Sequence, residues 1–79
     1  MTAAEALTAD PLPCGARLLV EDDTSASIEA EGLSVALYLD PVTGEWVAVR
    51  RRLVVSAVAT GRTATEALAG LGSVAGGGR

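Results

Sequence analysis

The chain has 79 residues and a formal net charge of −4, contains no His and holds a single Cys. This length suits one small domain, and the acidic balance argues against nucleic-acid binding through bulk positive charge. One Cys cannot form an intrachain disulfide. Without His, only carboxylates and one thiol remain as metal ligands, which argues against a structural zinc site, and the usual catalytic base is absent. We therefore expect a protein that is not an enzyme and that has no catalytic residue, metal or cofactor.

The expected core is poor in large side chains. Hydrophobic residues make up 49% of the chain, but aromatic residues only 3%, so Ala, Val and Leu must fill the interior. A chain of this size buries only about 60% of its unfolded surface. With no disulfide or metal to reinforce it, self-association or docking on a partner is the remaining source of stability, and we expect a homo-oligomer.

Two features predict that the chain is not membrane-bound. No apolar run reaches the roughly 20 residues that a membrane-spanning helix needs. The first ten residues carry Glu5 and no basic residue, unlike a secretory signal. We expect a cytoplasmic protein, with a virion as the alternative location.

The N-terminal segment has the signature of a short helix. Thr2 and Glu5 have the spacing of a capping box, which predicts a helix over residues 3–9 that a Pro-rich stretch ends. Residues 16–21 read as a short strand, and the acidic run Glu21–Thr24 reads as a turn.

Two further strands follow from alternation of apolar and polar residues. Residues 25–31 alternate, which places Ala26 and Ile28 on an inner face. Residues 33–39 place four apolar side chains on the same face: Leu33, Val35, Leu37 and Leu39. Residues 40–44 contain Pro and Gly at turn positions and predict a hairpin loop.

Residues 45–59 are continuously β-like. This run exceeds the usual five or six residues of a strand, so we expect a bend or bulge near Arg50-Arg51-Arg52. The second half of the run would then pair with an outer strand or with another chain.

A capped amphipathic helix follows the sheet. Thr63 and Glu66 repeat the capping-box spacing, and the apolar residues fall on one face, namely Ala64, Ala67, Leu68 and Leu71. Gly70 and Gly72 predict an early end, so residues 1–72 form one domain and residues 73–79 a flexible Gly-rich tail. The predicted fold is α+β: an antiparallel three- to four-stranded meander, with this helix packed on one face and the short helix at the N-terminus.

The partner-binding candidates are Trp46 and the only basic cluster, Arg50, Arg51 and Arg52. On a strand, Arg50 and Arg52 face one way and Arg51 the other, so the three are either an anion-binding contact or solvated charges that protect a sheet edge. Trp46 is either a core residue or an interface anchor.

The order of elements from Gly44 to Leu71 resembles the HicB-type antitoxin domain. Three consecutive segments carry the resemblance. They are Gly44-Glu45-Trp46-Val47-Ala48, the β run that follows it, and Thr60-Gly61-Arg62-Thr63-Ala64-Thr65-Glu66-Ala67-Leu68. The resemblance covers roughly residues 33–71. The family's Pro-Asp-Leu-Pro-Gly loop is replaced by Arg50–Val55, and no appended DNA-binding motif is present. The resemblance implies a three-stranded sheet with a packed helix, and a role in masking a partner protein.

Two functions from different classes follow. The first is a non-enzymatic protein-binding module, similar to a HicB-type antitoxin, that masks a toxin-like partner. The alternative is a structural subunit of a larger assembly, such as a phage virion protein. Neither function requires nucleic-acid binding by the chain itself.

Overall fold

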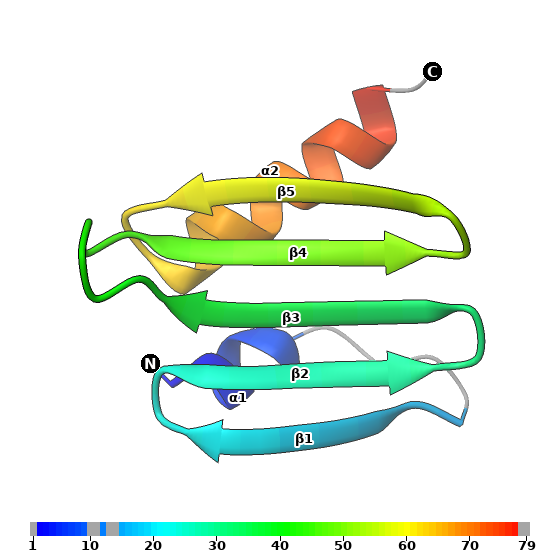
Figure 1. Ribbon diagram of the computed structural model, residues 1–79, viewed down its shortest axis with the longest axis horizontal. Helices are drawn as coiled ribbons and strands as arrows, with labels where there is room; N and C mark the ends of the chain where they lie inside the picture. Colours follow the sequence, from blue (N-terminus) through cyan, green and yellow to red (C-terminus); the bar gives the residue numbers. More distant parts are fainter. Residues whose placement is uncertain (1, 10–11, 13–14, 78–79) are drawn as a thin grey trace.

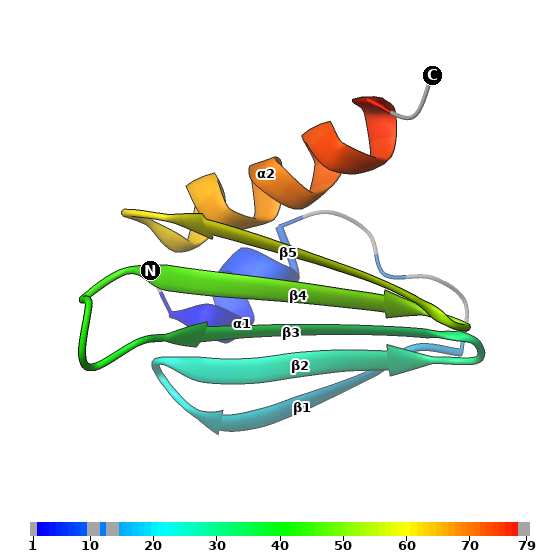
Figure 2. The same ribbon diagram turned by 45° about the horizontal axis from the view of Figure 1, so that its top comes forward.

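Five antiparallel strands form a single sheet, and both helices pack on one of its faces. The computed structural model describes residues 2–9, 12 and 15–77, with side chains described up to Leu71. The strands follow one another as a simple meander (Figure 1), and the face opposite the helices is uncovered by any described element (Figure 2). The elements are α1 (Ala3–Leu7), β1 (Arg17–Asp22), β2 (Ser25–Ala30), β3 (Leu33–Leu39), β4 (Trp46–Arg52), β5 (Val55–Gly61) and α2 (Ala64–Gly77). The predicted α+β class is confirmed, with five strands in place of three to four.

The short helix α1 is held by its cap and by its packing. The Thr2 N–H donates to Glu5 Oε1 at 2.7 Å, and the Glu5 N–H donates to Thr2 Oγ1 at 3.1 Å, as the capping-box spacing predicts. The Ala3 N–H donates to the Asp23 carbonyl at 2.8 Å, which ties α1 to the β1–β2 turn. A helix of five residues is unstable alone, so these contacts and the burial of Leu7 keep it in place.

The β1–β2 turn is closed by one carboxylate. Both the N–H and the hydroxyl of Thr24 donate to Asp22 Oδ1, at 2.8 and 2.9 Å. These bonds favour the charged form and lower the pKa of Asp22, as the bond from the Thr2 N–H lowers the pKa of Glu5. The pairing register shifts between Val20 and Asp22, so β1 contains a bulge there, and the other described strand pairs keep their register.

These two carboxylates predict a pH dependence of stability. A folded-state pKa below the ordinary values of 4.5 for Glu5 and 3.8 for Asp22 contributes stability that is complete above those values. The contribution is lost as the pH falls through the depressed folded pKa values. Chemical unfolding followed at a series of pH values should show the free energy of unfolding falling below pH 4.5. The double variant Glu5→Gln/Asp22→Asn should show a shallower fall, and an unchanged slope would contradict the assignment.

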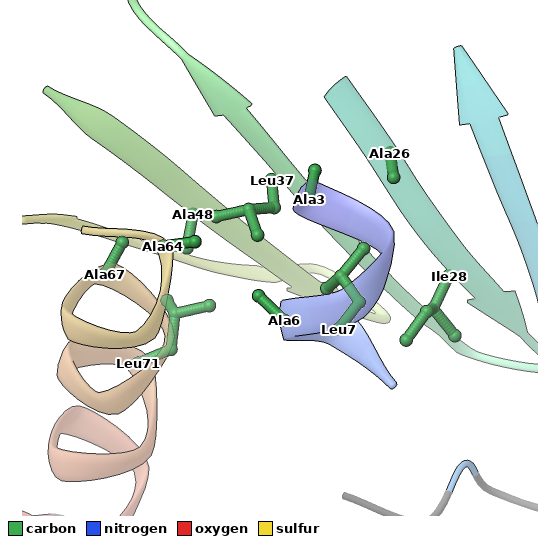
Figure 3. Packing of buried hydrophobic residues seen from close by; sticks show 10 residues of the cluster. All are labelled: Ala3, Ala6, Leu7, Ala26, Ile28, Leu37, Ala48, Ala64, Ala67 and Leu71. Atoms are coloured by element: carbon green, nitrogen blue, oxygen red, sulfur yellow. The ribbon is translucent and has the colours of Figure 1, made fainter. Parts of the chain in front are cut away.

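The core is a thin layer between the sheet and the helices. The alternation predicted for β2 and β3 is confirmed, because Ala26, Ile28 and Leu37 are buried on the helix-covered face. Figure 3 shows this layer, with Leu37 between the two helices. The buried residues are Ala3, Ala6, Leu7, Ala26, Ile28, Leu37, Ala48, Ala64, Ala67 and Leu71. Six of these ten are Ala, so the sheet and the helices pack closely together and the core has a small apolar volume.

The prediction of one long, bent strand is wrong. Residues 45–59 fold back on themselves, as β4 and β5 pair antiparallel with Arg52 opposite Val55. The connecting turn holds Leu53 and Val54 and contains none of the usual turn residues. Leu53 adopts a positive φ of 53°, which a non-Gly residue takes only at some cost. No local turn signal marked the reversal, and pairing with β4 supplies the backbone hydrogen bonds that β5 needs.

Helix α2 begins as predicted and continues further. The Glu66 N–H donates to Thr63 Oγ1 at 3.1 Å, and Ala64, Ala67 and Leu71 are buried against the sheet. The helix extends to Gly77, beyond the predicted end at Gly72, so most of the predicted tail is helical. Glycine lowers helix propensity without forbidding the helix. Residues 78 and 79 lie outside the described residues.

Candidate protein-binding surfaces

The described chain exposes more large apolar side chains than it buries. Four large hydrophobic side chains are buried, namely Leu7, Ile28, Leu37 and Leu71. Nine are exposed, namely Leu12, Leu19, Val20, Tyr38, Val42, Leu53, Val54, Val55 and Val58. Single exposed apolar residues are ordinary, whereas groups of them mark interaction sites. Two groups stand out, one at the β4–β5 turn and one on the uncovered face of the sheet.

The first group, here called the hairpin surface, consists of Arg50, Arg52, Leu53, Val54 and Val55. The three apolar side chains are 78%, 96% and 66% exposed, in sequence order. Together with Ala57, the same residues line a hollow of about 360 Å³. An apolar tip bordered by guanidinium groups suits a partner that offers apolar contact and carboxylates together.

The tip of the hairpin surface is held in place by the β2–β3 turn. The Leu53 N–H donates to the Gly32 carbonyl at 3.2 Å, which joins the β4–β5 turn to the β2–β3 turn. The Leu53 side chain also lies close to Gly32, since a Cβ built there would be 3.6 Å from Leu53 Cδ2. The exposed side chains are therefore presented on an anchored turn.

The structure separates the residues that the sequence grouped as partner-binding. Arg50 and Arg52 lie on the helix side of the sheet and Arg51 on the uncovered side, as strand alternation predicted. Trp46 is at the opposite end of β4, about 14 Å from Arg50 and about 20 Å from Arg52 at 3.4 Å per residue. It is half-buried and packs against the core. Trp46 and the three arginines therefore do not form one surface.

Sequence reasoning missed Leu53, Val54 and Val55, because it read them as the interior of a strand. The available signal was length: a β run of 15 residues is better explained by two strands than by one. Three apolar residues at that midpoint then have to lie at or beside a turn.

The second group, here called the open face, lies on the side of the sheet that no helix covers. Its central row runs across all five strands, and its members are Leu19, Ser27, Ala36, Val49 and Val58. On one side of this row lie Arg17, Glu29, Ser34, Arg51 and Ser56. On the other side lie Ser25, Tyr38, Val47 and Thr60. The open face is thus an apolar stripe between two more polar rows.

The open face is hollowed on its β1–β3 half. The small side chains Ser27 and Ala36 form the floor of a depression of about 280 Å³, which Leu19 and Tyr38 border. The Ser25 hydroxyl donates to Glu21 Oε1 at 2.8 Å at its edge. The β4–β5 half carries Val49 and Val58 in the same row, where the floor of the depression has the smaller Ser27 and Ala36.

The described residues contain no cluster of metal ligands and no membrane-spanning helix. Nowhere in residues 2–9, 12 and 15–77 do three or more Cys, Asp or Glu gather as metal ligands. Within the same ranges, no helix is long and apolar enough to cross a membrane. Cys14 lies outside the described residues. The only ion pair between described side chains joins Arg17 and Glu29 at 4.0 Å on the open face.

Comparisons with protein-family models, with curated proteins and with solved structures found no match for this chain. The resemblance to the HicB-type antitoxin domain therefore still rests on the residues quoted above.

Proposed function

We propose that this chain is a non-enzymatic binding module that docks on a partner protein through the hairpin surface and masks part of that partner. The observation that carries the proposal is the β4–β5 turn. Leu53 and Val54 are exposed where a two-residue turn would ordinarily hold Gly, Asn or Asp. Leu53 also adopts a positive φ, at a cost of about 1–2 kcal/mol. A role in contact with a partner explains why apolar residues occupy this turn.

The charge of the hairpin surface indicates the chemistry of the partner. Arg50 and Arg52 are on the same side of β4 and border the hollow beside the apolar tip. The chain as a whole is acidic, so these two side chains are a local positive site on a negative molecule. A partner with carboxylates around an apolar pocket would complement both features.

The order of elements supports an antitoxin-like role. Strands β3, β4 and β5 followed by α2 give a three-stranded meander with a packed helix, the arrangement that the HicB-type resemblance implies. The departure from that family is the hairpin surface itself, which occupies the position of the family's own loop. The proposed contact thus lies where this chain differs from the family.

Site-specific photocrosslinking tests the proposal. A photoreactive amino acid at position 54 places the probe on the hairpin surface, and one at position 42 places it on the loop between β3 and β4. Val54 and Val42 are 96% and 90% exposed, so the two probes are matched in accessibility. In the native host, the probe at position 54 should give one predominant crosslinked protein, and the probe at position 42 should not.

Two variants define which feature binds. Leu53→Gly removes the apolar tip and the positive-φ cost, so the free energy of unfolding should stay constant or rise by up to about 1 kcal/mol while crosslinking is lost. Arg50→Glu/Arg52→Glu should also abolish crosslinking, with an unchanged circular dichroism spectrum. Equal crosslinking from positions 42 and 54, or full crosslinking in the Leu53→Gly variant, would contradict the proposal.

A further inference from the structure

The open face has features of its own, separate from the hairpin surface and from the proposed function. Leu19 and Val58 are 45% and 60% exposed at its two edges, and no described element covers the largely apolar row between them. A five-stranded face of about 24 by 20 Å presents roughly 480 Å² per copy. Two such faces in contact would bury close to the 1,000 Å² or so that a specific interface needs.

We infer that the open face packs against the open face of a second copy, about a two-fold axis that runs along β3. Such an axis places β2 of one copy over β4 of the other, and β1 over β5. The resulting interface is isologous, so each contact occurs twice. Two sheets that pack in this way have aligned strands and lie about 10 Å apart.

The shape of the open face favours this arrangement. The depression over Ser27 and Ala36 lies on the β1–β3 half, and Val49 and Val58 lie on the β4–β5 half. The two-fold axis sets Val49 of each copy over Ser27, on the floor of the depression of the other. Val58 then faces Leu19, which borders the depression.

The charges favour the same arrangement. Glu29 on β2 and Arg51 on β4 lie in one row, on either side of Ser34 on β3. They are therefore related by the proposed axis, which sets Glu29 of each copy opposite Arg51 of the other. Arg17, which pairs with Glu29 within the chain, would lie opposite Ser56. A lipid surface or a nucleic acid would select one sign of charge, whereas this face carries both signs at matched positions.

The arrangement also has a consequence for the hairpin surface. An axis parallel to the strands keeps both β4–β5 turns at the same end of the dimer. The Arg50 and Arg52 side chains lie on the opposite side of β4 from the open face and stay accessible. The dimer would present two hairpin surfaces in one direction, which increases avidity for a repeated or dimeric partner.

A charge-swap experiment on the full chain tests the inference. Sedimentation velocity over micromolar to millimolar concentrations should show a monomer–dimer equilibrium for the unmodified chain. Glu29→Arg and Arg51→Glu each place like charges opposite one another twice, so each should weaken dimerisation by about tenfold or more. The double variant Glu29→Arg/Arg51→Glu should dimerise more strongly than either single variant, and less strongly than the unmodified chain because the ion pair between Arg17 and Glu29 within the chain is lost.

A second pair of variants covers the apolar contact. Val58→Glu should leave a folded monomer, because Val58 is already exposed in the single chain, whereas Val42→Glu on the β3–β4 loop should dimerise normally. The inference is overturned if the unmodified chain is a monomer throughout, if it forms only larger particles, or if the double charge swap dimerises no more strongly than the single variants. None of these results bears on crosslinking at position 54, so the two proposals fail separately.

Discussion

Leu37→Ala should remove a large part of the stability of this domain. Among the side chains that the structure describes, Leu37 is the only large one with no exposed surface, and it lies between the two helices (Figure 3). Truncation of a buried Leu costs about 2–5 kcal/mol, because apolar contact is lost and a cavity remains. A domain of this size has a total of roughly 4–12 kcal/mol. The cost is therefore a large fraction of the whole free energy of unfolding.

Trp46 is half-buried and packs against the core, so its fluorescence reports on unfolding of the core. Urea unfolding followed by its fluorescence should show the midpoint of the Leu37→Ala variant at much lower urea, or no folded baseline at all. Val42→Ala, at a position 90% exposed, is the matched control and should unfold like the unmodified chain. A Leu37→Ala variant with an unchanged midpoint would show that the layer around Leu37 is not the core.

Gly61→Ala should also destabilise the fold strongly, for a steric reason. Gly61 is buried where β5 ends, just before α2 begins, and a Cβ there would lie 2.6 Å from Glu66 Cβ and 2.8 Å from the Ala67 backbone nitrogen. The first turn of α2 would have to move away from the sheet. Overpacking of this kind costs about 1–3 kcal/mol. The effect arises from close approach, since Gly61 does not have a positive φ.

Gly70→Ala provides the comparison for Gly61→Ala. A Cβ at position 70 would meet only the Ala59 methyl group, at 2.8 Å. The second change Ala59→Gly removes that methyl, so the pair Gly70→Ala/Ala59→Gly should recover stability relative to Gly70→Ala alone. No side-chain change can relieve Gly61→Ala in this way, because two of the three close contacts are with backbone atoms, the Ala67 nitrogen and the Glu66 carbonyl carbon. Thermal unfolding of these three variants beside the unmodified chain measures the difference, and a Gly61→Ala variant as stable as the unmodified chain would contradict the close packing.

Local signals in the sequence correctly predicted the starts of both helices and the positions of β2 and β3. Thr2 with Glu5 and Thr63 with Glu66 marked the two helix starts, since a hydroxyl and a carboxylate at this spacing satisfy backbone N–H groups within a few residues. Alternation identified β2 and β3 and their inner faces. Such patterns depend only on neighbours in the chain, so a sequence contains them in full.

The candidate site was predicted only in part. Strand alternation correctly placed Arg51 on the face opposite Arg50 and Arg52. Trp46 does not lie beside the three arginines with which it was grouped, since it is at the other end of β4. The apolar tip was missed, because Leu53 and Val54 have no turn propensity and their reversal depends on pairing between β4 and β5.

The sequence by itself determined the α+β class, the two helix starts, the inner faces of the middle strands and the small-residue composition of the core. Tertiary structure alone decided that residues 45–61 form a hairpin, that both helices cover the same face, and that Glu29 and Arg51 lie at matched positions on the other face. The physical reason is the separation along the chain of the residues that interact. Caps and alternation arise within a few residues, whereas a turn without turn residues and the exposure of a sheet face depend on strands and helices far apart in the chain.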